Sequence, residues 1–307
     1  TTSLYQRIRD HRLSPAQESS SLLSDDGSTE DRPEALPFVG REAELDRIDK
    51  GFVQAQRGNG RVLLITGEAG SGKTRLIQGF IQRYVVPSEG TVAAWGAGNA
   101  QAGDGDPYLP FREILRLLAG DFDVPTLQES LTPVLSQQLE ALAPVVTSAL
   151  QRYGPDLIGA FLPTGNRRIS THRDGDASPV PPAPAALCDQ AERVFRTIAQ
   201  QCTLVLVVED LHWADRSTLN LLAHLGRRIR GSRILLIGSY RSAEASTALI
   251  QIVRELQRSH GDITLSLDHV AGRAFIDAIL DSHPNALART FREGLYRQTG
   301  GHALFTV

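Results

Sequence analysis

The segment Gly67-Glu68-Ala69-Gly70-Ser71-Gly72-Lys73-Thr74 joins an apolar run to an amphipathic one. The residues before it, Val62-Leu63-Leu64-Ile65, are typical of a buried parallel strand. After it, apolar residues recur at helical spacing: Leu76, Ile77, Phe80, Ile81, Tyr84 and Val85. Glycines and a Lys-Thr pair at this spacing, between a strand and a helix, are typical of a phosphate-binding P-loop. The alternative, a glycine-rich turn with a surface lysine, is disfavoured by both flanking elements.

The glycines let the backbone curl so that several N–H groups converge on phosphate oxygens, and the helix N-terminus adds its dipole. Lys73 is then expected on the β- and γ-phosphates, and Thr74 is expected to offer its hydroxyl to Mg²⁺. The predicted nucleotide contacts in this segment are Glu68, Ala69, Gly70, Ser71, Gly72, Lys73, Thr74 and Arg75.

A second informative segment is Leu204-Val205-Leu206-Val207-Val208-Glu209-Asp210. A continuous apolar run that ends in two acids predicts a buried strand with carboxylates at its C-terminal edge. Mg²⁺ and an attacking water both need such groups, and Glu209 and Asp210 are candidates for either role. If Asp210 holds the water, its short side chain predicts slow hydrolysis; the alternative is that Asp210 serves the metal. The alternative, that the pair only caps a strand or helix, is disfavoured by the presence of the P-loop.

The run Ile234-Leu235-Leu236-Ile237-Gly238 predicts a further buried strand, which leads to Ser239-Tyr240-Arg241. Arg241 is a candidate γ-phosphate sensor, because a guanidinium fits phosphate in a bidentate manner. His212 is a candidate for contact with the phosphate site, and Trp213 is interpreted as a packing residue. Asp215 or Ser217 is predicted to cap the next helix.

Two more strands are predicted, one at Val92-Ala93-Ala94-Trp95 and one where Ile263, Leu265 and Leu267 alternate with polar residues. Five predicted strands separated by helices indicate an α/β fold: a five-stranded parallel sheet flanked by helices, with nucleotide at the C-terminal strand edges. Residues 1–13 are predicted to end a preceding helical domain, and the Ser-, Asp-, Glu- and Pro-rich residues 14–37 to be a linker. Residues 38–267 form the predicted α/β domain, in which 163–185 lack apolar periodicity and are expected to be a flexible insertion. Residues 268–307 are expected to begin a small helical lid domain.

The composition sets limits on partners and compartment. A net charge of −3 and a pI near 6.2 predict no general attraction to nucleic acid or to an anionic membrane face. Two cysteines are too few for a disulfide framework, which favours a reducing cytoplasm. No apolar run approaches the roughly 20 residues needed to span a bilayer. Because methionine is absent and the sequence ends in an apparent helix start, we expect an excerpt of a longer polypeptide.

Five segments, in order and spacing, carry a family resemblance: Phe38-Val39-Gly40-Arg41-Glu42, the P-loop, Glu209-Asp210-Leu211-His212-Trp213-Ala214-Asp215, Ser239-Tyr240-Arg241 and Thr299-Gly300-Gly301-His302-Ala303-Leu304-Phe305. As a set, over about residues 37–307, they resemble the nucleotide-binding module of signal-transduction ATPases with numerous domains (STAND), an AAA+-related class. Bacterial transcriptional regulators of the antibiotic-regulatory-protein type contain this module. The opening Thr2-Ser3-Leu4-Tyr5-Gln6-Arg7-Ile8-Arg9 is similar to the end of their bacterial transcriptional activation domain.

The resemblance implies an ATP/ADP switch that is closed with ADP, opens with ATP, and forms a homo-oligomer in the ATP state. It implies adenine contacts from the backbone of Val39, Gly40 and Arg41, and DNA contact only through domains outside this sequence. One departure concerns the lid: the family usually has a proline at its start, where Asp268-His269-Val270 stands here. Contact between the lid and the base is therefore left open.

Two other functions remain open from the residues. A metabolic or transport P-loop ATPase would turn over rapidly, and a pure binding module would hold nucleotide without hydrolysing it. A kinase is disfavoured because no obvious acceptor-binding element follows the P-loop.

Overall fold

A computed structural model of the 307-residue chain describes residues 40–100, 106–122, 132–162, 182–267, 276–277, 280–281 and 289–299. All of them belong to one compact unit, Pro37–Val307. The predictions for Val39, for residues 1–13 and 14–37, and for most of the insertion 163–185 and the lid 268–307 lie outside the described residues.

The five predicted strands form one parallel sheet in the order β2-β3-β4-β1-β5. The strands are β1 (Arg61–Thr66), β2 (Thr91–Ala97), β3 (Thr203–Glu209), β4 (Ile234–Tyr240) and β5 (Thr264–Ser266). The P-loop strand β1 lies between β4 and β5, and β4 separates it from the acid-bearing strand β3. The predicted α/β fold is confirmed.

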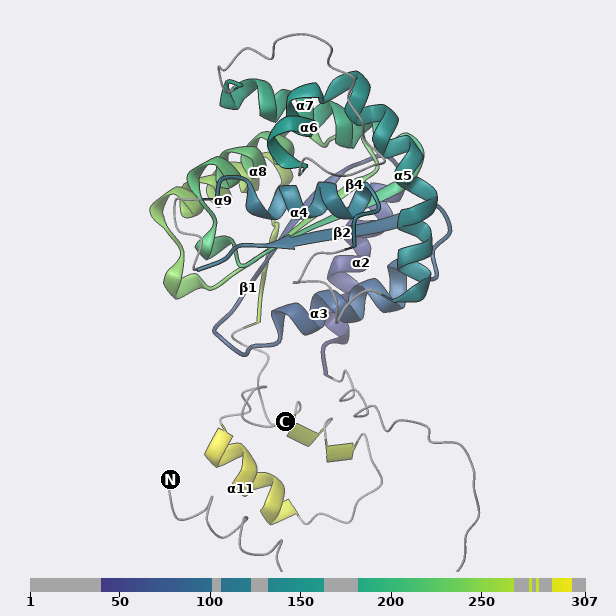
Figure 1. Ribbon diagram of the computed structural model, residues 1–307. Coiled ribbons are helices and arrows are strands. Elements are labelled where there is room, and N and C mark those ends of the chain that lie inside the picture. Colours follow the sequence, from purple (N-terminus) through teal and green to yellow (C-terminus); the bar gives the residue numbers. More distant parts are fainter. Residues whose placement is uncertain are drawn as a thin grey trace, which may run out of the picture. The chain divides into compact units, whose positions relative to one another are not determined.

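Helices cover both faces of the sheet (Figure 1). In Figure 1, α2 (Glu42–Gln56) and α3 (Lys73–Phe80) lie on one face, and α4 (Leu109–Leu118), α8 (Arg216–Arg228) and α9 (Thr247–His260) lie on the other. With this strand order, right-handed crossovers require α3 to lie opposite α4, α8 and α9. A π-helical turn, Ile81–Val85, continues α3. The remaining helices are α5 (Pro133–Tyr153), α6 (Pro155–Phe161), α7 (Pro184–Ile198) and α11 (Arg289–Thr299).

The apolar runs of the sequence become the buried strands. Every residue of β4 is buried, and in β1 and β3 only the first or the last residue is partly exposed. Such continuous burial is expected of a parallel sheet with helices on both faces. At the start of α8, the carboxylate of Asp215 accepts hydrogen bonds from the backbone N–H groups of Ser217 and Thr218, so Asp215 is the predicted cap.

The register brings the informative strand ends to one edge. Thr66 of β1 is paired with Tyr240 of β4, and Ala97 of β2 with Glu209 of β3. Because all strands run in parallel, the segments that follow them, with the P-loop, Asp210 and Arg241, emerge at the same edge.

None of the helices in the described part of the chain is long and apolar enough to cross a membrane.

Candidate functional site

The P-loop turns sharply between β1 and α3. Gly70 and Gly72 have φ of 73° and 90°, a left-handed region that strains side-chain-bearing residues. Gly72 is the N-cap of α3, where no side chain caps the helix and the first turn holds no acidic residue. The N–H groups of the first helical turn, which have no intrahelical partner, are therefore left to an anionic ligand.

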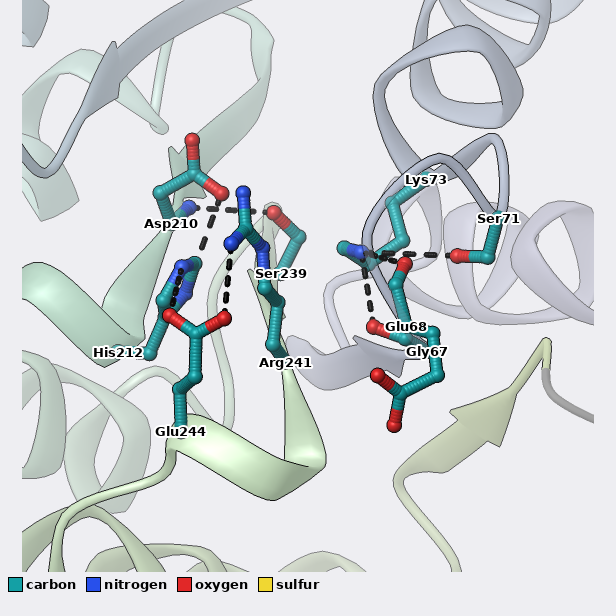
Figure 2. A network of polar contacts seen from close by, with 9 residues as sticks. All are labelled: Gly67, Glu68, Ser71, Lys73, Asp210, His212, Ser239, Arg241 and Glu244. Atoms are coloured by element: carbon teal, nitrogen blue, oxygen red, sulfur yellow. Dashed lines mark hydrogen bonds and ion pairs between the residues drawn. The ribbon is translucent and has the colours of Figure 1, made fainter. Parts of the chain in front are cut away.

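Lys73 is buried inside the loop, with 8% of its surface exposed. Its ammonium Nζ donates to the carbonyl oxygens of Gly67 at 2.9 Å and Glu68 at 2.8 Å, and Ser71 Oγ lies 3.5 Å away (Figure 2). A buried charge is costly unless it is hydrogen-bonded, and these carbonyls meet that requirement. The loop thus holds a positive charge ready at the point where phosphate is expected.

Arg41, just before α2, reaches the same loop with its side chain. Its Nη2 donates to the backbone oxygen of Ser71 at 3.1 Å, and its Nη1 to Glu44 Oε1 at 3.2 Å. Both side chains of the ion pair are only 6% exposed. The sequence predicted a backbone role for Arg41 and did not indicate this side-chain contact, although the three-residue spacing from Glu44 was a usable signal.

Glu209 lies at the end of β3, next to Thr74. Burial raises the pKa of the Glu209 carboxyl; the charge of Asp210 adds to the rise, whereas the hydrogen bond with Thr74 and the charge of Lys73 oppose it. Its Oε1 atom is buried without a hydrogen-bond partner. The two residues also line a cavity of about 20 Å³, together with Ile77, Trp95 and others. That volume suits roughly one water molecule.

Asp210 points elsewhere because its backbone is left-handed, with φ 53° and ψ 45°. Its N–H donates to Ser239 Oγ of β4 at 3.2 Å. Gly98 must be glycine to allow this turn, since a Cβ there would lie 2.6 Å from the Asp210 carbonyl oxygen. The turn gives the two neighbouring acids different surroundings: Glu209 faces Thr74, and Asp210 faces His212, with 3.9 Å between Asp210 Oδ1 and His212 Nδ1.

Arg241 follows β4 and forms an ion pair with Glu244, with 2.8 Å between Nη1 and Oε1 (Figure 2). Its guanidinium carbon lies 5.1 Å from the ring centroid of Trp213. Trp213 is 36% exposed, so its interpretation as a packing residue is wrong: the ring faces a cation at the surface instead.

His212 lies between the two acids of this cluster. Its Nε2 is 3.7 Å from Glu244 Oε2, and neither ring nitrogen has a hydrogen-bond partner. Burial is the largest cause of a lowered pKa for His212.

Most of the residues proposed from the sequence meet at one edge of the sheet. The P-loop from Gly67 to Thr74 faces the ends of β3 and β4, which bring Glu209, Asp210 and Arg241, and Figure 2 shows the Lys73 and Arg241 networks on opposite sides of the site. Arg75 lies on the exposed surface of α3. Gly40 and Arg41 precede α2, and Arg41 touches the loop. Glu44, Gly98 and Glu244 were not predicted. The contacts of Gly98 and Glu244 depend on backbone turns that the sequence does not specify, whereas the spacing of Glu44 from Arg41 was a signal that could have been used.

In the part of the chain that the structure describes, side chains that could hold a metal are few. Within the described ranges, no group of three or more His, Cys, Asp or Glu residues could hold an ion. Mg²⁺ commonly keeps water and substrate phosphate oxygens as most of its ligands, so the Thr74 hydroxyl and a carboxylate suffice for it.

A P-loop between a strand and a helix, acids on β3 and an arginine after the intervening β4 define the class of P-loop nucleoside-triphosphatases. More specifically, the AAA ATPase domain model matches residues 37–237, more than half of the 307 residues, and the chain belongs to this family.

A curated relative is an uncharacterized protein of Rhizobium meliloti (strain 1021), 25% identical over 230 residues. The alignment covers 68% of this chain and 19% of that protein, so the chain spans about a fifth of the length of this relative.

Among solved structures, similar chains occur in Drosophila ORC bound to DNA (14% identity, TM-score 0.47, covering 99% of this chain and 65% of that one) and in the Aeropyrum pernix Orc1 protein in complex with DNA (16%, 0.45, 89% and 59%). Cdc6p from Pyrobaculum aerophilum is similar at 15% identity, with a TM-score of 0.42 and coverage of 81% of this chain and 51% of that one.

Proposed function

We propose that this chain is the ATP-binding, slowly hydrolysing switch module of a larger regulatory protein, with Mg²⁺ as its cofactor. The observation that carries this proposal is the buried Lys73 ammonium, hydrogen-bonded inside a P-loop that lies next to the Thr74–Glu209 pair. A surface lysine on a glycine-rich turn would have no reason to be buried there.

When phosphate binds, hydrogen bonds to phosphate oxygens replace hydrogen bonds that the loop makes within itself. The N–H groups at the start of α3 receive phosphate oxygens, and the Lys73 ammonium exchanges the Gly67 and Glu68 carbonyls for β- and γ-phosphate oxygens. Arg41 fixes the Ser71 carbonyl and so helps to hold the loop in its curled shape. The backbone of residues 39–41 is proposed to contact adenine.

The residues present fit Mg²⁺. The Thr74 hydroxyl and the Glu209 carboxylate would hold it, and the unpartnered buried Oε1 of Glu209 is an acceptor in need of a cation or of a water bound to one. When bound, Mg²⁺ neutralises charge on the β- and γ-phosphates. We therefore assign the metal role to Glu209 and the orientation of the attacking water to Asp210.

Hydrolysis is expected to be slow. Asp210 has a short side chain on a left-handed turn, and its carboxylate already interacts electrostatically with His212 and Arg241. Arg241 is proposed to contact the γ-phosphate, which distinguishes ATP from ADP. A switch needs ATP to bind one conformation more tightly than the other, by several kcal/mol for a complete change of state.

The proposal also concerns the longer protein to which this module would belong. The curated relative is about five times as long as the matched region, which supports a module within a multidomain protein. By its resemblance to STAND modules, we propose a cytoplasmic bacterial transcriptional regulator that forms homo-oligomers with ATP and contacts DNA through other domains. No membrane association is proposed.

The test is binding of ATP and ADP to the Lys73→Ala variant, with Lys50→Ala as the control. Lys50 is the other lysine of the sequence and lies exposed on α2. Lys73→Ala should lose most nucleotide affinity, whereas Lys50→Ala should bind like the parent. Equal affinity in Lys73→Ala and the parent would contradict the proposal.

The rate of ATP hydrolysis distinguishes the proposed switch from the two alternative functions. Phosphate release on the order of one per minute or slower fits a switch of this chemistry. Rates far above that favour a metabolic or transport ATPase, and unchanged ATP after prolonged incubation with Mg²⁺ favours a pure binding module. The nucleotide that co-purifies with the protein gives an independent check.

A further inference from the structure

The cation expected to contact the γ-phosphate is already engaged within the protein. Arg241 Nη1 lies 2.8 Å from Glu244 Oε1, and the guanidinium faces the ring of Trp213 at 5.1 Å. The side chain of Arg241 is 26% exposed, so it is held at the rim of the site rather than extended into solvent.

The position of Glu244 is set by local backbone structure. Ser242–Glu244 form a 3₁₀ turn directly after β4, and the Glu244 N–H donates to the Arg241 carbonyl at 3.2 Å. This turn places the carboxylate next to the guanidinium at the strand end. The pair therefore belongs to the sheet edge that carries the candidate phosphate site.

The charges around the pair connect it to the P-loop. The hydrogen bond from Arg241 is the largest cause of a lowered Glu244 pKa, and Lys73 and His212 lower it further. The pKa of Arg241 is raised first by its hydrogen bond with Glu244 and further by the charges of Asp210 and Glu68. The negative charge of Glu244 thus offsets the positive charge of Arg241, which would otherwise repel that of Lys73 across the site.

We propose that Glu244 is a positioning residue that holds Arg241 away from the nucleotide until a γ-phosphate is present, so that this exchange of partners tunes the preference for ATP over ADP. The inference rests on the proposed function. It goes beyond that function by naming the group with which the γ-phosphate competes.

The exchange follows from the chemistry of the guanidinium. Its planar fork makes similar charge-assisted hydrogen bonds to carboxylate and to phosphate oxygens, so Glu244 and the γ-phosphate compete for the same donors. ADP lacks the competing group and leaves the pair intact. A ligand shifts such an equilibrium only through its differential affinity for the two arrangements, which here comes from the third phosphate.

The experiment compares Glu244→Gln with Glu255→Gln. Glu255 is 41% exposed, close to the 46% of Glu244, and forms a 2.7 Å ion pair with Arg227; both variants remove one negative charge. Calorimetric titration with Mg²⁺ and either ADP or a non-hydrolysable ATP analogue gives the ratio of the two affinities.

The ratio should shift toward the ATP analogue by about two- to fivefold in Glu244→Gln, the range of an exposed ion pair, and stay unchanged in Glu255→Gln. The shift should disappear when Glu244→Gln is combined with Arg241→Gln. A fall in the ratio, an equal shift in both single variants, or a shift that persists without Arg241 would overturn the inference.

The two proposals fail in different ways. A parent protein that binds neither nucleotide contradicts the proposed function, and the inference falls with it. A parent that binds both, with an unchanged ratio in Glu244→Gln, contradicts the inference alone.

Discussion

Replacing Arg41 by alanine removes one member of a buried ion pair and leaves the other in place. Glu44 would then be a carboxylate with a 6% exposed side chain that has lost its 3.2 Å partner, and the Ser71 carbonyl of the P-loop would lose a 3.1 Å hydrogen bond. A buried charge that has lost its partner is far more costly than a missing surface contact.

The expected loss is about 3–5 kcal/mol in the free energy of unfolding, the range for breaking a buried pair from one side. For a domain of this size, each kcal/mol lowers the melting temperature by about 2–4 °C, so the shift should be roughly 6–20 °C. Removing both charges in Arg41→Ala/Glu44→Ala should cost less than Arg41→Ala alone, because no charge then remains buried.

The assay is urea unfolding of nucleotide-free protein, since bound nucleotide would add its own stabilisation. Arg227→Ala is the matched control: it breaks the exposed pair with Glu255 and should cost at most about 1 kcal/mol. The slope of the unfolding free energy against urea should be the same in all variants.

Two results would refute this reasoning. Equal losses in Arg41→Ala and Arg227→Ala would show that burial of the pair contributes nothing. A double variant less stable than Arg41→Ala would show that the Glu44 carboxylate is not destabilised by the loss of its partner. Either outcome would also remove the argument that Arg41 holds the P-loop in shape.

Three further predictions concern the sheet edge and the packing of α8 against α9. Gly98→Ala should destabilise the protein by about 1–3 kcal/mol, because its Cβ would lie 2.6 Å from the Asp210 carbonyl oxygen; Gly159→Ala on α6, with open space around it, should not be destabilising in the same urea assay. Asp210→Asn should slow phosphate release while leaving ATP affinity within about twofold, since it keeps its shape but loses the charge that orients water. Burial, as the largest cause, lowers the pKa of His260, and the charges of Arg230 and Arg61 lower it further, whereas the contact of its Nε2 with the Gly226 oxygen at 2.6 Å opposes the shift. The Nδ1 atom of His260 is buried without a partner. The folded protein therefore favours the neutral ring and should lose stability as pH falls from about 6.5 toward the lowered value, and unfolding measured at pH 7.5 and 5 should show a smaller loss in His260→Gln.

The sheet could be predicted because its signals are local. Strands β1 to β4 contain short, largely apolar runs, β5 lies where apolar and polar residues alternate, and the P-loop is a contiguous segment whose flanks identify it. Parallel strands separated by helices then require that their C-terminal ends meet, which is why Glu209 and Arg241 could be placed near Lys73 without coordinates.

The contacts that distinguish neighbouring residues could not be predicted in this way. Glu209 and Asp210 are adjacent in sequence, and only the left-handed backbone of Asp210, permitted by the close approach of Gly98, sends their side chains to different partners. Arg41 meets the carbonyl of Ser71 across 30 positions of the chain. Trp213 was misjudged because its surroundings depend on tertiary structure: the ring is partly exposed and faces Arg241, which follows strand β4.

The strand order explains why an arginine rather than a second lysine suits the rim of this site. Because β4 lies between β1 and β3, the side chain that follows β4 stands between the P-loop cation and the acids after β3. Lys73 is fully engaged by loop carbonyls on one side, and Asp210 faces His212 on the other. Under the proposed exchange, the residue in the middle holds an acid in the absence of nucleotide and turns to phosphate in its presence; in this structure its guanidinium also faces an aromatic ring. A guanidinium makes planar, paired hydrogen bonds and stacks on a ring, whereas an ammonium is a point charge that lacks such a face. On this argument Arg241→Lys should fail to replace Arg241 in discriminating ATP from ADP even though the charge is kept, and an unchanged ratio of the two affinities in that variant would show that charge alone is sufficient.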